Sequence, residues 1–278
     1  MQSLKDTIRE GPKILKSKLD TRDYKLFTLP NKMTCLVISD MEADKSAAAI
    51  DVHVGSALDP RTHYGAAHFL EHMLFQGTEK YPRENEYDEY ISNNGGYNNA
   101  FTSLEDTNYH FEVSNEGFEG ALDRLAQFFI SPKFSEDSAD REVNAVDSEF
   151  NQSLSSDAWH FFNLTQVVSN PKSNYNRFDC GNKKSLEVPG MRQKLLDFHK
   201  DWYSANIMSL YVIGCESVET LQQWVVEKFS PVVNKEVVVP NLCEDKPFNP
   251  EDLGKVIKFV PVKDKDIMTI FYQLPYCQ

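Results

Sequence analysis

Two histidines and a glutamate stand close together in residues 65–77, at a spacing suited to metal-dependent hydrolysis. The segment reads Gly-Ala-Ala-His-Phe-Leu-Glu-His-Met-Leu-Phe-Gln-Gly. Helix-forming residues followed by a glycine predict a helix over about residues 64–76. His68 and His72 are four residues apart, so both imidazoles would project from one face, within reach of a single metal ion. Glu71 lies beside His72, where its carboxylate could deprotonate a metal-bound water; this HxxEH order is known from catalytic zinc sites.

A catalytic zinc ion takes three protein ligands and leaves a fourth position for water, so a further ligand is needed. Residues 136–153 have helical character and offer Glu142 and Glu149, which are seven residues apart and therefore share a face. One could bind zinc while the other supports a histidine by a hydrogen bond. Periodicity alone does not decide between them. A purely structural zinc site would need four protein ligands, and we find only three in the sequence.

The motif and its spacing resemble the insulin-degrading enzyme (insulysin) branch of the pitrilysin family of zinc metallopeptidases. In that family HxxEH is followed by a glutamate after 76 residues, and 76 residues lie between His72 and Glu149. The similarity extends through residues 120–129 and 141–149 and covers about residues 20–278. The resemblance implies an N-terminal portion of such an enzyme.

The resemblance also assigns a role to each residue of the motif. It implies that one Zn²⁺ per chain is held by His68, His72 and Glu149. Glu71 would then be the general base, and Glu142 would orient the ligands.

Substrate contacts are implied for one strand and for several aromatic residues. Residues 98–102, Asn-Asn-Ala-Phe-Thr, resemble an edge strand of the family that binds the substrate backbone as an added strand, which points to Asn99, Ala100 and Phe101. Phe75 and Phe101 would line the pocket before the scissile bond, and Trp159 the pocket after it. For Phe75 and Trp159 the alternative is ordinary packing in the hydrophobic core.

The remaining sequence predicts the elements that position these groups. Alternation of apolar and polar residues predicts strands at 34–39, 47–54, 107–113 and 210–213. Helical periodicity predicts helices at about 64–76, 84–94, 117–130, 136–153, 190–203 and 217–229. Strands that occur singly or in pairs among helices favour an α+β fold, in which helices cover a mostly antiparallel sheet.

The domain organisation follows from the loss of helical periodicity after residue 229, where four prolines between 230 and 253 indicate a connector. We expect an N-terminal extension (1–20), a zinc-binding peptidase domain (21–235), a linker (236–253) and the truncated beginning of a second, similar domain (254–278). Within the last segment 256–260 and 267–274 are predicted strands. So short a segment cannot bury a core of its own.

Composition narrows the class of protein. A formal net charge of −13 disfavours nucleic acid or an anionic membrane as the main partner. We find neither a signal peptide nor an apolar stretch of transmembrane length, so the sequence predicts a cytoplasmic protein. The five cysteines are widely spaced and form no CxxC pair, which favours free thiols.

The sequence therefore predicts a zinc metalloendopeptidase that hydrolyses short to medium unfolded peptides. The resemblance implies enzymes of four related domains, whose second half contributes Arg and Tyr groups to substrate binding and oxyanion stabilisation. Because those groups are not in this sequence, a chain carrying the C-terminal half is a candidate partner beside the peptide substrates. The alternative is a non-catalytic peptide-binding or assembly subunit of the same family, against which the intact motif argues.

Overall fold

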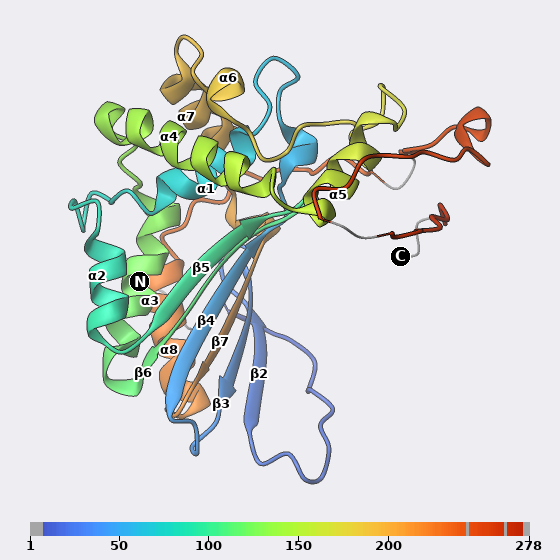
Figure 1. The fold of residues 1–278 in the computed structure, drawn as a ribbon. Coiled ribbons are helices and arrows are strands. Elements are labelled where there is room, and N and C mark those ends of the chain that lie inside the picture. Colours follow the sequence, from blue (N-terminus) through green and yellow to red (C-terminus); the bar gives the residue numbers. More distant parts are fainter. Residues whose placement is uncertain (1–7, 243–244, 264–265, 275–278) are drawn as a thin grey trace.

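The computed structural model describes residues 8–242, 245–263 and 266–274, and its centre is one seven-stranded sheet (Figure 1). The strand order is β1-β2-β3-β7-β4-β6-β5, and every neighbouring pair is antiparallel except β3 and β7. The predicted α+β fold with a mostly antiparallel sheet is therefore confirmed. The strands are β1 (Arg9–Glu10), β2 (Asp23–Thr28), β3 (Thr34–Ser39), β4 (Lys45–Val52), β5 (Tyr97–Thr102), β6 (Thr107–Ser114) and β7 (Met208–Gly214).

One face of the sheet is buried under helices. Alternate residues of β4 and β6, among them Ile50, Val52 and Tyr109, are fully buried, as the alternation in the sequence predicts. Helices α2 (Glu86–Asn93), α3 (Phe118–Ile130) and α8 (Val218–Phe229) cover this face (Figure 1). The hydrophobic core lies between these helices and the sheet.

A second group of helices lies beyond one end of the strands (Figure 1). It consists of α1 (Ala66–Leu74), α4 (Glu136–Ser153), α5 (Asp157–Val167), α6 (Lys183–Leu186) and α7 (Met191–Trp202). Short 3-10 turns stand elsewhere along the chain, at Ser56–Leu58, Asn115–Gly117, Ala205–Ile207 and Pro250–Asp252. Helix α1 packs against α4, α7 and β5. The six predicted helices and the four strands predicted before residue 230 all form, with bounds within two residues of the prediction.

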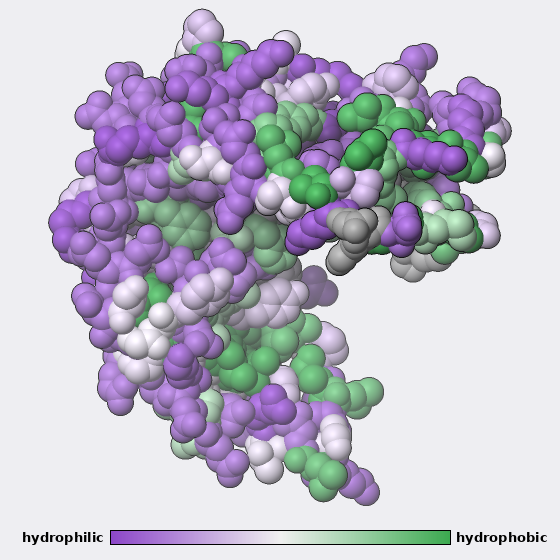
Figure 2. Space-filling view, viewed as in Figure 1, coloured by the Kyte–Doolittle hydropathy of each residue, from purple (hydrophilic) through white to green (hydrophobic). Residues whose placement is uncertain are grey.

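The opposite face of the sheet is only partly covered and carries an apolar row. Leu26, Leu36 and Tyr211 are paired across β2, β3 and β7, and Tyr211 is 48% exposed. Figure 2 shows hydrophobic side chains over the lower part of the sheet. This face therefore holds apolar surface outside the core.

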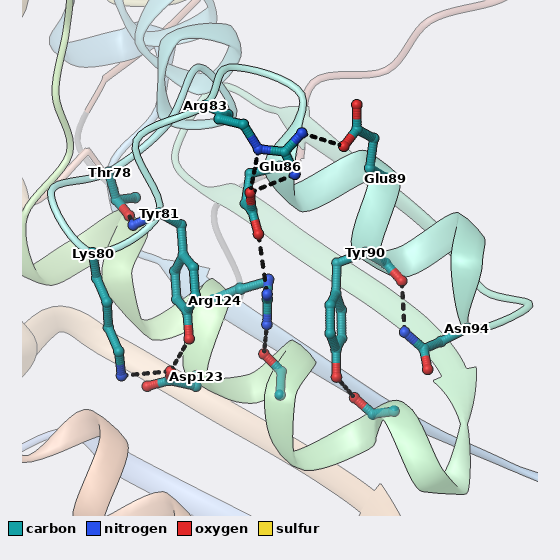
Figure 3. A network of polar contacts seen from close by, with 12 residues as sticks. Thr78, Lys80, Tyr81, Arg83, Glu86, Glu89, Tyr90, Asn94, Asp123 and Arg124 are labelled. Carbon is teal, nitrogen blue, oxygen red and sulfur yellow. Dashed lines mark hydrogen bonds and ion pairs between the residues drawn. The ribbon is translucent and has the colours of Figure 1, made fainter.

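A cluster of polar contacts fixes the loop that follows α1 (Figure 3). The guanidinium of Arg124 lies between two rings, 4.2 Å from the centroid of Tyr81 and 3.7 Å from that of Tyr90. Arg124 Nη2 also donates to Glu86 Oε1 at 3.1 Å, and the Tyr81 hydroxyl donates to Asp123. These contacts attach residues 78–86 and α2 to α3.

The predicted strands at 256–260 and 267–274 are wrong. The structure places no strand between residue 254 and residue 274 among the residues that it describes, and most of the large apolar side chains there are exposed. Alternation in sequence records a tendency to bury one face, but a strand forms only where another strand supplies hydrogen-bond partners. No described element pairs with these segments.

Candidate metal site

Helix α1 presents two imidazoles side by side. The His68 and His72 ring centroids are 4.8 Å apart, as the spacing of four residues predicts. Helix α4 brings Glu149 to them, with Oε2 at 3.5 Å from His68 Nε2 and 3.4 Å from His72 Nε2. One ligand atom from each residue lies within 4.8 Å of the other two. Two imidazole nitrogens and one carboxylate oxygen are a donor set of three-ligand zinc sites, so these residues fit the predicted ion.

The Nδ1 atoms of the two imidazoles have different partners. His68 Nδ1 lies 2.6 Å from the backbone oxygen of Cys180, and because a carbonyl only accepts, Nδ1 must carry the proton. In the neutral ring the lone pair of His68 is then on Nε2, which faces Glu149. His72 Nδ1 lies 3.1 Å from Glu142 Oε2, and the other oxygen of Glu142 accepts from Gln76 Nε2 at 3.0 Å. Each ring is thus oriented for binding through Nε2.

Carboxylates set the protonation of His72. Burial lowers its pKa, but hydrogen bonds to Glu142 and Glu149 and the charge of Glu71 outweigh burial and raise the pKa to about 9. The hydrogen bond from His72 is also the main reason that the pKa of Glu149 is lowered. In the metal-free site a protonated His72 therefore supplies the positive charge that a bound metal ion would bring.

Glu71 is the buried carboxylate of the group, at 6% exposure. Its Oε2 accepts a hydrogen bond of 2.6 Å from Thr102 Oγ1 on β5. Burial raises the pKa of Glu71, whereas the charge of His68 and the bond from Thr102 oppose that rise. A carboxyl group with a raised pKa is suited to taking up and returning a proton near neutral pH.

A cavity of about 820 Å³ opens over these residues, between α1, β5, α4 and α5. It brings together every residue that the sequence singled out. These are His68, Glu71, His72, Phe75, Asn99, Ala100, Phe101, Glu142, Glu149 and Trp159.

The wall of the cavity includes a strand edge, a partly buried aromatic ring and an exposed aromatic ring. Strand β5 is the last strand in the sheet order, and the structure pairs it with β6 alone among the described strands, so its outer edge is free of a strand neighbour. Phe75 is half-buried and makes edge contacts with Tyr87 and Phe128, so it belongs to the core as well as to the cavity wall. Trp159 is 47% exposed, which excludes core packing as its explanation.

Sequence reasoning gave no role to three groups that contact the site. Thr102 and Gln76 stand inside the stretches that were singled out, and only the structure shows that they bond to Glu71 and Glu142. The third group is the backbone oxygen of Cys180, which no side-chain pattern could reveal.

Comparison with known proteins places these residues in context. The family model described as insulinase (peptidase family M16) matches residues 34–172, and the model described as the peptidase M16 inactive domain matches residues 191–277. The second match begins at α7 and includes β7, a central strand of the sheet.

Among similar proteins, the insulin-degrading enzyme of Bos taurus is 49% identical over 92% of this chain and 26% of its own length. A Schizosaccharomyces pombe protein whose name carries the words zinc protease is 47% identical over 92% of this chain and 27% of its own length. The A-factor-processing enzyme of Saccharomyces cerevisiae is 43% identical over 94% of this chain and 26% of its own length. The chain thus spans about a quarter of the length of these relatives.

A solved structure supports the fold. The crystal structure of pitrilysin superposes with a TM-score of 0.81 at 35% identity, over 84% of this chain and 26% of that one. None of the described helices has the length and hydropathy that a membrane span requires.

Proposed function

Because the chain belongs to the insulinase family of peptidases (family M16), we propose that it acts as a zinc metalloendopeptidase on short to medium unfolded peptides. The observation that carries this proposal is the meeting of His68, His72 and Glu149 from two helices, with a buried Glu71 beside them in one cavity. The cavity is large enough for several residues of a peptide and is bordered by a free strand edge.

In this proposal His68, His72 and Glu149 hold one Zn²⁺ per chain, and Glu142 orients His72. When bound, zinc supplies Lewis-acid chemistry, polarising a peptide carbonyl and lowering the pKa of water to about 7. Glu71 removes the proton from the attacking water. Its Oε2 is engaged by Thr102, which leaves Oε1 to take that proton and then deliver it to the leaving amine.

The substrate contacts extend along the cavity. The peptide backbone is added to the free edge of β5 at Asn99, Ala100 and Phe101. Phe75 and Phe101 contact the side chain before the scissile bond, and the exposed ring of Trp159 contacts the side chain after it. The positions of all five residues on the cavity wall support these assignments.

The domain boundaries stay as proposed from the sequence: an extension over 1–20, the peptidase domain over 21–235, a linker over 236–253 and the start of a second, similar domain over 254–278. Val232 is buried, and the Asn206 side chain donates to the backbone oxygen of Val237 at 2.8 Å, so packing against the sheet domain continues to about that point. We also propose that a partner chain supplies the part of the relatives that this chain does not span. The free thiols of Cys35, Cys180 and Cys215 support a cytoplasmic location.

The test is zinc content together with cleavage of a quenched fluorescent peptide, for the wild type and for Glu71→Gln. We expect one zinc ion in both proteins and hydrolysis only in the wild type. Glu79→Gln is the matched control, because Glu79 is exposed and lies outside the cavity. Zinc without hydrolysis in the wild type would point to a metal-binding part that needs the groups of the proposed partner chain, and a chain without zinc would overturn the site.

A further inference from the structure

A short segment, residues 177–183, bridges the two helices that carry the proposed zinc ligands. We call this segment the strap. Its residue Cys180 accepts a hydrogen bond of 2.6 Å from His68 Nδ1 through the backbone oxygen. Three residues later, the backbone N–H of Lys183 donates to Asp147 Oδ1 at 2.8 Å. Asp147 lies on α4, two residues before Glu149, so the strap contacts both ligand-bearing helices.

A buried arginine attaches the beginning of the strap to the segment before α1. Arg177 is 9% exposed; its Nη1 donates to the backbone oxygen of Asp59, and its Nη2 donates to Asn174 Oδ1 at 2.6 Å. The carboxylate of Asp59 in turn accepts from the backbone N–H of Gly65 at 2.7 Å and of Ala67 at 2.8 Å. Helix α1 has no cap from its own N-cap side chain, so Asp59 takes that role. The same residue therefore holds both the start of α1 and the strap.

The strap and the start of α1 also touch without a side chain between them. Gly65 has a φ of 85°, and a Cβ added to it would lie 2.4 Å from Gly181 Cα. Such an approach is open only to glycine. The Cys180 oxygen is thus held at His68 by close backbone packing on one side and by the Arg177 anchor on the other.

We propose that Arg177 and Asp147 are positioning residues of the metal site, which act through the strap. Arg177 holds the Cys180 oxygen against His68, and Asp147 holds the strap against α4 beside Glu149. The inference rests on the proposed function, because it requires that His68 and Glu149 bind zinc. Loss of partners that orient metal ligands weakens metal affinity by about 10- to 100-fold, and a similar loss is expected when either anchor is removed.

The experiment measures the zinc affinity of the full chain by competition with a chromophoric chelator, and the visible spectrum of the Co²⁺ form. Asp147→Ala should weaken zinc binding by roughly tenfold and alter the Co²⁺ spectrum. Asp147→Asn should restore most of the affinity, because its amide oxygen still accepts from Lys183 N–H although the charge is lost. Asp140→Ala, an exposed change on the same helix, should leave affinity unchanged. Arg177→Gln should weaken binding as Asp147→Ala does.

Because Arg177 is buried, its variant could lose its fold, and far-UV circular dichroism is recorded for every protein. In that case the test rests on Asp147→Ala and Asp147→Asn, because Asp147 is half-exposed. Wild-type zinc affinity in Asp147→Ala, together with loss of zinc in His68→Ala, would overturn the inference and leave the proposed function standing. Zinc binding that survives in His68→Ala would instead overturn the proposed metal site, and the inference with it.

Discussion

The proton on His72 must leave before zinc binds. Zinc affinity should therefore depend on pH, in a range set by the pKa of His72. A histidine ligand binds a metal only when unprotonated. In the metal-free chain, hydrogen bonds to Glu142 and Glu149 outweigh burial and raise the pKa of His72 from 6.5 to about 9. The experiment therefore measures zinc affinity while the pH is varied between about 6.5 and 9.5.

The expected magnitude follows from the distance between the pH and that pKa. At about pH 7 the group lies roughly two units below its pKa of about 9, so its proton costs zinc binding on the order of 3 kcal/mol. Apparent affinity should rise about tenfold per pH unit from about pH 7 and level off above about pH 9. A histidine with an ordinary pKa of about 6.5 would give less than a twofold rise above about pH 7. The same shift stabilises the metal-free fold below about pH 6.5, and that contribution is lost as the pH rises through about 9.

The assay is chelator competition across this pH range, with calorimetry in two buffers of different ionisation enthalpy to count released protons. His72 should contribute about one proton per zinc at about pH 7.5. The matched variant is Glu142→Gln, which removes one carboxylate that raises the pKa and should flatten the slope while other sources of protons persist. Affinity that is independent of pH between about 7 and 9 would refute the reasoning.

Three further changes test the fold around the site. Phe128→Ala removes a ring that is 2% exposed and contacts four other aromatic rings, so denaturant unfolding should show a loss of about 3–5 kcal/mol. Arg124→Ala removes the guanidinium between two tyrosine rings and its ion pair, so Tm should fall by an amount corresponding to about 1–3 kcal/mol while zinc affinity stays unchanged. Gly65→Ala places a Cβ 2.4 Å from Gly181 Cα at a positive φ, so thermal stability and zinc affinity should fall together; retention of both would contradict the close packing of the strap on α1.

The sequence predicted those elements whose burial is periodic. Strand β4 alternates between buried and half-buried residues and α3 has a continuous apolar stripe, so both were found within two residues of their bounds. Helix α5 was missed because its apolar residues do not gather on one face: Trp159 and Val167 are exposed, and the helix borders the cavity instead of the core. Strand β5 is polar in sequence, Tyr-Asn-Asn-Ala-Phe-Thr, and only the family resemblance predicted it.

The site was predictable to a different degree at each residue. His68 and His72 follow from local helical geometry, because a spacing of four fixes their relative direction. Glu149 lies on another helix, and no local rule connects a residue across 76 intervening positions, so only the resemblance selected it over Glu142. The structure places both glutamates on α4 at the histidines, but Glu142 faces His72 Nδ1 and Glu149 faces both Nε2 atoms.

The hydrogen bond between Thr102 and Glu71 joins two parts of the proposed mechanism that the sequence treats separately. Thr102 is the last residue of β5, and its hydroxyl engages the buried carboxylate at 2.6 Å. A peptide that pairs with the free edge of β5 therefore binds to the same strand that holds the proposed base. Glu71 itself is carried by α1, so this hydrogen bond also joins α1 to β5. The distance between the base and the scissile bond is in this way set by the packing of α1 against β5, which the hydrogen bond between Thr102 and Glu71 helps to fix.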